Sequence, residues 1–150
     1  MNRPAFEPTL KGRALRLLSQ REHSRLELER KLAAHETEPG QLARALDELQ
    51  ARGFISEARV VESVIHRRAG KLGAARVRQE LAAKGVSGEA VLEAMDKLRA
   101  TELDRAREVW RRKFGERATD PKEKARQIRF LVSRGFATEV VRRVVQAADD

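Results

Sequence analysis

Apolar residues recur along the chain at intervals of three and four positions, the spacing that places them on one face of an α-helix. Residues 10–20 show this pattern clearly, and the apolar face consists of Leu10, Ala14, Leu15, Leu17 and Leu18. Eight further segments of this kind follow along the chain. The pattern therefore predicts nine helices and an all-α fold.

Residues that favour the ends of helices separate these segments. Ser24 followed by Glu27 has the spacing of a capping box, which predicts a helix start. Asp120 followed by Pro121 predicts another, because aspartate caps helices and proline suits the first helical position. Three glycines are predicted to end helices in a left-handed conformation: Gly53, Gly85 and Gly135. Four more residues are predicted N-caps: Ser56, Ser87, Thr101 and Thr138.

The central segment, Val77–Ala100, occurs in weaker form on both sides of itself. LERKLAAHE (28–36) aligns with VRQELAAKG (77–85), and FLVSRGFATEVV (130–141) aligns with ELAAKGVSGEAV (80–91). Both offsets are roughly 50 residues, which is typical of repeat architectures built from one helical unit. The sequence predicts three three-helix repeats after a flexible N-terminal arm: the arm is 1–9, and the repeats are 10–52, 53–100 and 101–150.

A three-helix unit of about 50 residues is near the lower limit for burying a core by itself. Stacked repeats share apolar surface, so we expect the three units to form an elongated, curved array. The apolar residues of each helix are expected to face inward, Leu92 and Val132 included.

The chain has a formal net charge of +9 over 150 residues. The basic excess is spread over all three predicted repeats and is largest in residues 101–150. A distributed positive charge suits a long polyanionic partner, such as nucleic acid or a protein filament built on it. A well-solvated basic surface with acidic residues interspersed is the alternative.

Two groups of basic residues are the candidate binding residues for such a partner. Guanidinium and ammonium groups can contact phosphates or an acidic protein groove. The central group surrounds the loop between Gly70 and Gly73 and comprises Arg67, Arg68, Lys71, Arg76 and Arg78. The second group, in the last repeat, comprises Arg111, Arg112, Lys122, Arg126 and Arg129, of which the last three share one helix face.

The sequence contains no catalytic or cofactor-binding motif that we recognise. Glycine-rich phosphate loops and a nucleophile elbow are absent. Cysteine is absent too, and His23, His35 and His66 lack the spacing of metal ligands. Trp110 and Phe114 fall at the spacing of core residues. We therefore expect no enzyme activity, no metal and no cofactor.

The N-terminal segment does not resemble a signal peptide, and no apolar run approaches the roughly 20 residues that a membrane-spanning helix needs. We expect a soluble, cytoplasmic protein that is monomeric.

Three blocks of sequence carry a family resemblance. They are REHSRLELERKLAAH (21–35), LQARGFISEARVVESVIHRRAGKLGAARVRQELAAKGV (49–86) and RFLVSRGFATEVV (129–141). In this order they resemble the RecX family, bacterial regulators of the RecA recombinase. The resemblance extends from about Leu10 to the C-terminus. It implies a modulator fold of three tandem three-helix repeats, in agreement with the helical pattern.

The resemblance further implies a function in homologous recombination, DNA repair and the SOS response. RecX proteins bind along the helical groove of the RecA filament on single-stranded DNA. There they block filament extension or promote disassembly, and so lower ATP hydrolysis, strand exchange and coprotease activity. By this resemblance the chain is expected to be a negative regulator of RecA, with weak direct contacts to DNA also possible.

Two other functions are alternatives. A helix-turn-helix module that reads DNA directly needs basic or amide side chains at the start of its recognition helix. The candidate helix starts, SGEA (87–90) and TEVV (138–141), are instead acidic and apolar. A nuclease would need clustered acidic residues to hold metal ions, whereas the acidic residues here are dispersed between basic ones.

Overall fold

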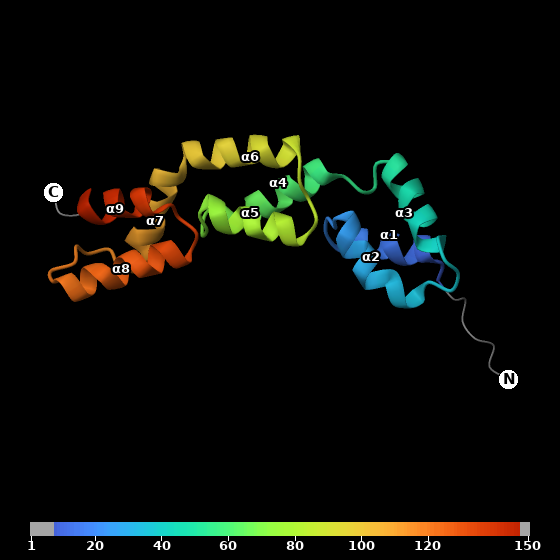
Figure 1. Ribbon diagram of the computed structural model, residues 1–150, viewed down its shortest axis with the longest axis horizontal. Coiled ribbons are helices and arrows are strands. Elements are labelled where there is room, and N and C mark those ends of the chain that lie inside the picture. Colours follow the sequence, from blue (N-terminus) through green and yellow to red (C-terminus); the bar gives the residue numbers. More distant parts are fainter. Residues whose placement is uncertain (1–7, 148–150) are drawn as a thin grey trace. The chain divides into compact units, whose positions relative to one another are not determined.

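The computed structural model describes residues 8–147, and within this range the chain forms nine α-helices, one short 3-10 helix and no strand (Figure 1). This confirms the predicted all-α fold. In chain order the elements are α1 (Leu10–Gln20), α2 (Arg25–Leu32), η1 (Ala33–His35), α3 (Gln41–Ala51), α4 (Glu57–Arg68), α5 (Ala74–Ala83), α6 (Glu89–Ala100), α7 (Glu102–Lys113), α8 (Pro121–Ser133) and α9 (Thr138–Ala147).

The chain divides into two compact units, residues 1–60 and 61–150. Helices α1, α2 and α3 pack against one another in the first unit. In the second unit, α5 packs on α6, α6 on α7, and α7, α8 and α9 pack against one another. Of the predicted flexible arm, residues 1–7 lie outside the described residues. Thr9 is not part of an arm, because its side chain accepts a hydrogen bond from the Gly12 amide (2.9 Å) and caps α1.

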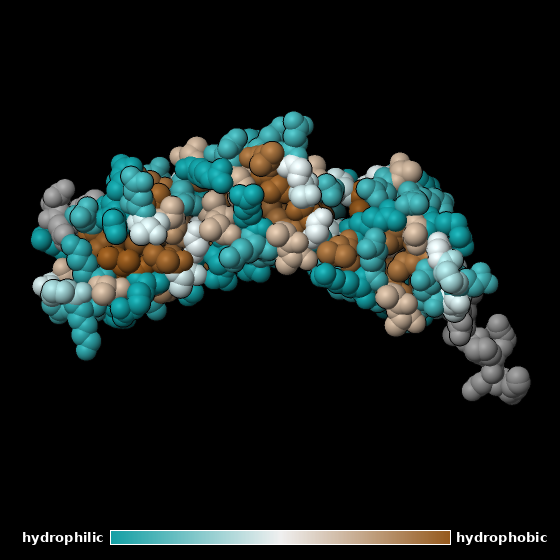
Figure 2. All heavy atoms as spheres, viewed as in Figure 1, coloured by the Kyte–Doolittle hydropathy of each residue, from teal (hydrophilic) through white to brown (hydrophobic). Residues whose placement is uncertain are grey.

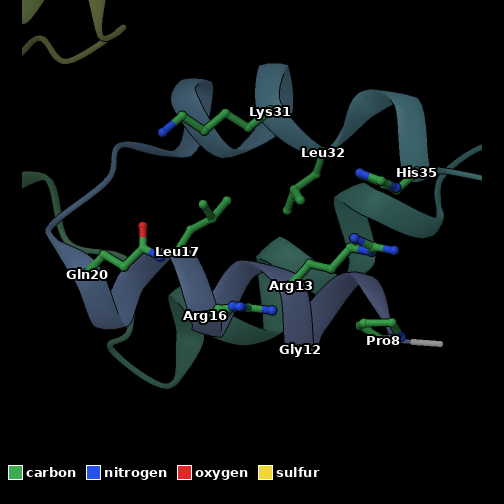
Figure 3. Close-up of a pocket in the computed structure, with 9 residues that line it drawn as sticks. All are labelled: Pro8, Gly12, Arg13, Arg16, Leu17, Gln20, Lys31, Leu32 and His35. Carbon is green, nitrogen blue, oxygen red and sulfur yellow. The ribbon is translucent and has the colours of Figure 1, made fainter. Parts of the chain in front are cut away.

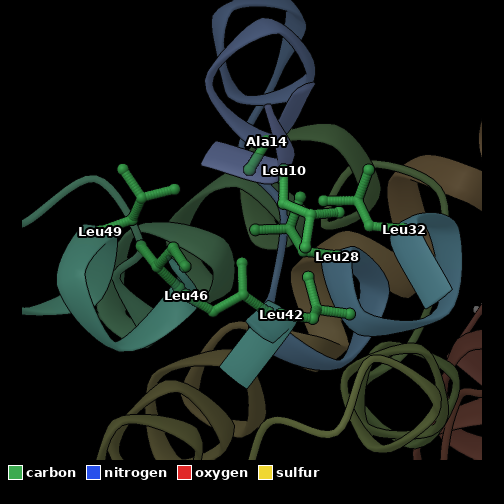
Figure 4. Close-up of a cluster of buried hydrophobic side chains, with 8 residues drawn as sticks. Leu10, Ala14, Leu28, Leu32, Leu42, Leu46 and Leu49 are labelled. Atoms are coloured by element: carbon green, nitrogen blue, oxygen red, sulfur yellow. The ribbon is translucent and has the colours of Figure 1, made fainter. Parts of the chain in front are cut away.

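The core of the first unit is built almost entirely from leucine. Figure 4 shows these side chains pointing toward one another from α1, α2 and α3. Leu28, Leu46 and Leu49 are completely buried, and each buried leucine side chain contributes on the order of 1.5–3 kcal/mol to the free energy of unfolding. The full cluster is Leu10, Ala14, Leu28, Leu32, Leu42, Leu46, Leu49 and Ile55.

A buried histidine lies beside this core. His23 precedes the Ser24 cap of α2 and is only 1% exposed. Its Nδ1 lies 3.0 Å from the carbonyl oxygen of Arg21, and its Nε2 lies 3.0 Å from the Nζ of Lys31. Because an ammonium group only donates, Nε2 accepts and Nδ1 carries the proton, so the ring is neutral. Burial lowers the pKa of His23 below its ordinary value of 6.5, and the charges of Arg21 and Lys31 act in the same direction.

This environment predicts that the protein loses stability as the pH falls below 6.5. The unfolded chain takes up a proton at His23 at a higher pH than the folded chain does, so unfolding is favoured as the pH falls toward the folded pKa. Urea unfolding between pH 5.5 and 8 should show this slope, and His23→Gln should flatten it. The matched control is His66→Gln, at an exposed position in α4, which should leave the slope unchanged. If stability depended on pH equally in the two variants, His23 would not be the residue responsible for the loss of stability at low pH.

Several predicted helix ends are confirmed. Ser24 and Glu27 form both hydrogen bonds of a capping box, and the Asp120 side chain caps α8 with Pro121 in its first turn. Ser56 accepts from the Arg59 amide (3.2 Å). The three predicted C-terminal glycines all have positive φ, and each is followed by an amide that bonds back to the last helical turn: Phe54 to Leu49, Val86 to Leu81, and Phe136 to Leu131.

Two predicted N-caps are wrong, and a third holds the cap position without the capping hydrogen bond. Gly88, not Ser87, occupies the cap position of α6, and no side chain caps that helix. Thr101 occupies the cap position of α7 as predicted, but its side chain accepts no hydrogen bond from a backbone amide of that helix. Its hydroxyl donates to the Leu98 carbonyl (3.3 Å), and its oxygen accepts from the Nε of Arg105 (3.0 Å). Thr138 is the first residue of α9, one position beyond the cap. The amide at that cap, of Ala137, bonds instead to a distant carboxylate.

Two predicted inward residues are exposed. Leu92 is 58% exposed because α6 buries the neighbouring face, which carries Val91, Met95 and Leu98. Val132 is 42% exposed because α8 turns Leu131 and the polar Gln127 into the core. Sequence spacing alone does not separate such adjacent apolar positions.

The last three helices share a core of small apolar residues and Phe136. In Figure 2, hydrophobic atoms are visible where α8 and α9 meet. Trp110 packs against this cluster as predicted, and its Nε1 donates to Oε1 of the buried Gln127 (2.9 Å). Phe114 is half-buried and packs on Phe130. The buried members are Ala106, Val109, Leu131, Phe136, Val141, Val144 and Val145.

Over residues 8–147 no helix combines the length and the apolar character required to cross a bilayer.

Candidate functional site

The loop between α4 and α5 makes a very close contact with the turn between α8 and α9. The Gly73 amide donates to the Arg134 carbonyl (2.8 Å). A Cβ atom at Gly73 would overlap the Gly135 carbonyl and lie 2.5 Å from the Phe136 nitrogen. Gly135 itself has φ of +91° and would overlap the Arg76 side chain if it carried a Cβ. Both positions therefore require glycine.

A buried glutamate ties the same two segments together. Glu102, at the start of α7, is 5% exposed. Its Oε1 accepts from the Ala74 amide (2.7 Å), and its Oε2 accepts from the Ala137 amide (3.1 Å). These two amides lie at the N-terminal ends of α5 and α9, where the helix dipole favours a negative charge. One carboxylate thus satisfies two helix starts that are far apart in sequence. We call this contact, with Gly73, Gly135 and Glu102, the glycine–glutamate joint.

Arg105 completes the contact from the next turn of α7. Its Nη1 donates to the carbonyls of Ala69 (3.0 Å) and Leu72 (2.7 Å), and its Nη2 donates to that of Leu98 (2.7 Å). Burial lowers the pKa of the guanidinium, and Glu102 acts in the opposite direction. These bonds occupy Arg105 within the fold, so it is not available to a partner.

The central basic group does not form one uniform patch. Arg67 and Arg68 both pair with Glu80 of α5, at 3.6 and 2.9 Å. Arg76 packs on Gly135, and its Nη1 donates to the Ser133 carbonyl (2.7 Å). Three of the five predicted residues therefore have intramolecular partners.

Lys71 and Arg78, the other two, have no ion-pair partner among the described residues and line different cavities. Lys71 lines a cavity of about 320 Å³ together with Arg112. Arg78 lines a larger groove of about 590 Å³, together with Arg99 and Val132. The fold thus brings Lys71 and Arg112 together, although they belong to different predicted groups.

The basic residues of the last repeat differ in the same way. Arg111 and Arg112 share Glu108, at 2.7 and 3.3 Å, and hydrogen bonds from these two guanidiniums lower the pKa of that carboxyl group. Arg126 pairs with Glu123 (2.9 Å) and lies 5.4 Å from the centre of the Phe114 ring.

Lys122 and Arg129 lie exposed on α8 without an ion-pair partner in the part of the chain that the structure describes. They are the two members of the predicted helix stripe whose charge is left unneutralised.

A further cavity, of about 250 Å³, lies in the first unit between α1 and α2. Figure 3 shows Leu17 and Leu32 pointing toward one another across it, with Arg13 close to His35. Its lining is apolar at the centre and basic at the edge. No residue that lines it was singled out from the sequence as a binding residue.

Sequence reasoning missed two residues that the structure makes important. Glu102 looks like an ordinary acidic residue in a first helical turn, and its partners lie 28 and 35 positions away. Arg134 is the C-cap residue of α8, and its side chain lies over the ring of Phe130, four positions earlier; this i,i+4 helical spacing is a signal that the sequence does contain. Among the residues that the structure describes, no three His, Asp or Glu side chains are grouped as metal ligands would be.

Comparison with known families matches the chain in three consecutive segments. Residues 11–49 match the first three-helix domain of RecX, residues 56–95 the second, and residues 100–145 the third. The matches assign α1–α3, α4–α6 and α7–α9 to three successive domains of one family.

Individual proteins match over nearly the full chain. The regulatory protein RecX of Leptothrix cholodnii is 57% identical over 148 residues, which cover 99% of this chain and 93% of the relative. The regulatory protein RecX of Ralstonia nicotianae is 46% identical over 141 residues, with coverage of 94% and 89%. The crystal structure of RecX from Lactobacillus salivarius has the same fold, with a TM-score of 0.74, 17% identity, and coverage of 93% and 94%. The chain therefore belongs to the RecX family of regulatory proteins.

Proposed function

We propose that this protein is a non-enzymatic negative regulator of the RecA recombinase. In this proposal it binds along the groove of the RecA filament on single-stranded DNA and inhibits filament extension, ATP hydrolysis, strand exchange and coprotease activity. The observation that carries the proposal is that all three RecX domains are matched in order along one chain. It acts as a cytoplasmic monomer.

The charge distribution supports a polyanionic partner. The net charge is +9, and several exposed cations of the second unit have no carboxylate partner among the described residues, notably Arg78, Lys122 and Arg129. Such groups keep their full charge for a partner, whereas paired groups such as Arg67 must first give up an existing ion pair. We therefore assign more of the binding energy to the unpaired cations.

The glycine–glutamate joint supports a rigid binding surface in the second unit. It holds α5, α7 and the α8–α9 turn together through backbone contacts and a buried carboxylate. Cations carried by these helices then have a fixed spacing before binding. Groups that are fixed in advance lose less conformational entropy when a partner binds.

The decisive experiment is a titration of the protein into preformed RecA filaments on single-stranded DNA while ATP hydrolysis is followed. We expect hydrolysis to fall at stoichiometric amounts. The variant Lys122→Glu/Arg129→Glu should need roughly ten times more protein for half-inhibition, because solvent-exposed ion pairs contribute about 0.2–1 kcal/mol each and like-charge repulsion replaces them.

The matched control for this variant is Arg142→Glu/Arg143→Glu, which makes the same change in net charge at exposed positions of α9, away from the α8 stripe. An equal loss in both variants would mean that only overall charge matters and would remove the role of the stripe. Unchanged ATP hydrolysis with the natural sequence would overturn the proposed function.

Direct reading of DNA sequence by a helix-turn-helix is not favoured by the helix starts. Helices α6 and α9 begin with Glu89 and with Thr138-Glu139, so an acidic side chain lies where a base-reading residue would be needed.

A further inference from the structure

A cavity of about 320 Å³ in the second unit is lined by four cations from three separate segments. Lys71 comes from the α4–α5 loop, Arg112 and Lys113 from the end of α7, and Arg134 from the residue after α8. Val109 and Phe130 form its apolar wall, and no acidic residue is among the described residues that line it. The cavity is therefore small, strongly basic and partly aromatic.

Two of these cations are held by an aromatic ring and not by a carboxylate. The Arg134 guanidinium carbon lies 4.5 Å from the centre of the Phe130 ring, and the Lys113 Nζ lies 5.3 Å from it. The edge-to-face contact with Phe114, at 5.5 Å between ring centres, supports the Phe130 ring in turn. A ring attracts a cation through its quadrupole but does not neutralise it. Both side chains are thus positioned while their charge remains available.

The other two cations are also largely available. Lys71 is exposed and has no ion-pair partner in the described part of the chain. Arg112 reaches Glu108 at 3.3 Å, but Arg111 contacts the same carboxylate at 2.7 Å and would hold it alone. Four positive charges therefore converge on one cavity with at most one shared counter-charge.

We infer that this cavity is a phosphate-binding site, which takes a phosphate group of a single nucleic-acid strand or of a free nucleotide. Lysine and arginine are the usual phosphate ligands. The guanidinium plane of Arg134 and the apolar wall beside it suit the stacked base that accompanies each phosphate. An acidic peptide offers the charge without a planar ring to stack on the Arg134 guanidinium, so this arrangement favours a nucleotide. The volume is close to the lower end of the range for small-ligand sites, roughly 300–1,000 Å³.

The phosphate site is tested in the absence of RecA. A negative result would therefore contradict the site but not the proposed regulation of RecA. The probe is a fluorescent oligothymidylate, with which the full-length chain is titrated at several salt concentrations. Lys71→Gln/Arg112→Gln removes two cations that have no role in the core. We expect about a tenfold loss of affinity. The salt slope, which is the slope of the logarithm of the binding constant against the logarithm of the salt concentration, should become smaller in magnitude by about 0.7 for each phosphate that is no longer neutralised. Lys113→Gln/Arg134→Gln should lose at least as much.

The matched control is Arg142→Gln/Arg143→Gln, which removes the same charge from α9, outside this cavity, and should lose no more than about twofold by general screening. Arg134→Lys should keep the salt slope of the natural sequence but bind the strand more weakly, because an ammonium group cannot stack on a base as a guanidinium does.

Competition identifies the source of the phosphate. Displacement of the strand by ADP or pyrophosphate supports a site for free nucleotides, whereas displacement only by unlabelled oligothymidylate supports a strand site. Equal losses in the cavity and control variants would overturn the inference. Displacement by oligoglutamate as effective as by oligothymidylate would overturn it as well, because the cavity would then recognise charge alone.

Discussion

Replacing Glu102 with alanine is expected to lower the free energy of unfolding of the second unit by about 3 kcal/mol. The substitution leaves the Ala74 and Ala137 amides without their acceptor, and an unsatisfied buried polar group costs about 1–3 kcal/mol. It also removes the carboxylate 3.7 Å from Arg105, which is then a half-buried cation without a counter-charge. Chemical unfolding followed by circular dichroism measures the change.

Two further variants make this result specific. Glu102→Gln should recover part of the loss, since its single amide oxygen can accept from only one of the two amides. Asp104→Asn, two positions along α7, removes an acidic side chain that is 84% exposed and should change stability by less than about 0.5 kcal/mol. If Glu102→Ala and Asp104→Asn were equally stable, the carboxylate would have no structural role.

The second large effect is expected from Gly73→Ala. The new methyl group would overlap the Gly135 carbonyl and the Phe136 amide, which are backbone atoms and cannot move aside as a side chain can. Overpacking of this kind costs about 1–3 kcal/mol, and separation of the two segments would also break the Gly73–Arg134 hydrogen bond. We expect the melting temperature of the second unit to fall by on the order of 10 °C.

Gly70→Ala is the matched control in the same loop. A Cβ there meets no atom within 4 Å, and the residue does not have positive φ. Alanine at such a position stabilises by about 0.4–1 kcal/mol, because the unfolded chain loses freedom. A melting temperature that fell as far for Gly70→Ala as for Gly73→Ala would show that the loop needs flexibility and not close approach.

The helices and their repetition were predictable from the sequence because both depend on local spacing. Capping at Ser24 and Asp120 was correct for the same reason, since each cap involves residues three positions apart. The predicted caps of α6 and α9 were wrong. Gly88 occupies the cap position of α6, and at the start of α9 the Ala137 amide bonds to the carboxylate of Glu102, which is distant in sequence. Local patterns do not reveal partners that lie elsewhere in the chain.

The candidate binding residues were predictable as a set of charges but not as a surface. In the sequence, nothing distinguishes Arg67, Arg76 and Lys71 from one another as candidate binding residues. In the structure the first is paired with Glu80, the second is packed on Gly135, and only the third is unpaired. Which cations remain without a counter-charge depends on the ion pairs that form between helices. That pairing follows from the packing of the helices and not from the order of residues.

The glycine–glutamate joint also bears on how the second unit folds and opens. The amides of Gly73, Ala74 and Ala137 all bond to atoms of other segments, so none of these bonds can form until α5, α7 and the α8–α9 turn have met. Breaking the bond from the Ala74 or the Ala137 amide leaves an oxygen of the buried Glu102 carboxylate without its donor. Local fraying at the start of α5 or α9 is therefore coupled to separation of the two repeats. The second and third repeats accordingly behave as one cooperative folding unit, and not as two independent links of a chain.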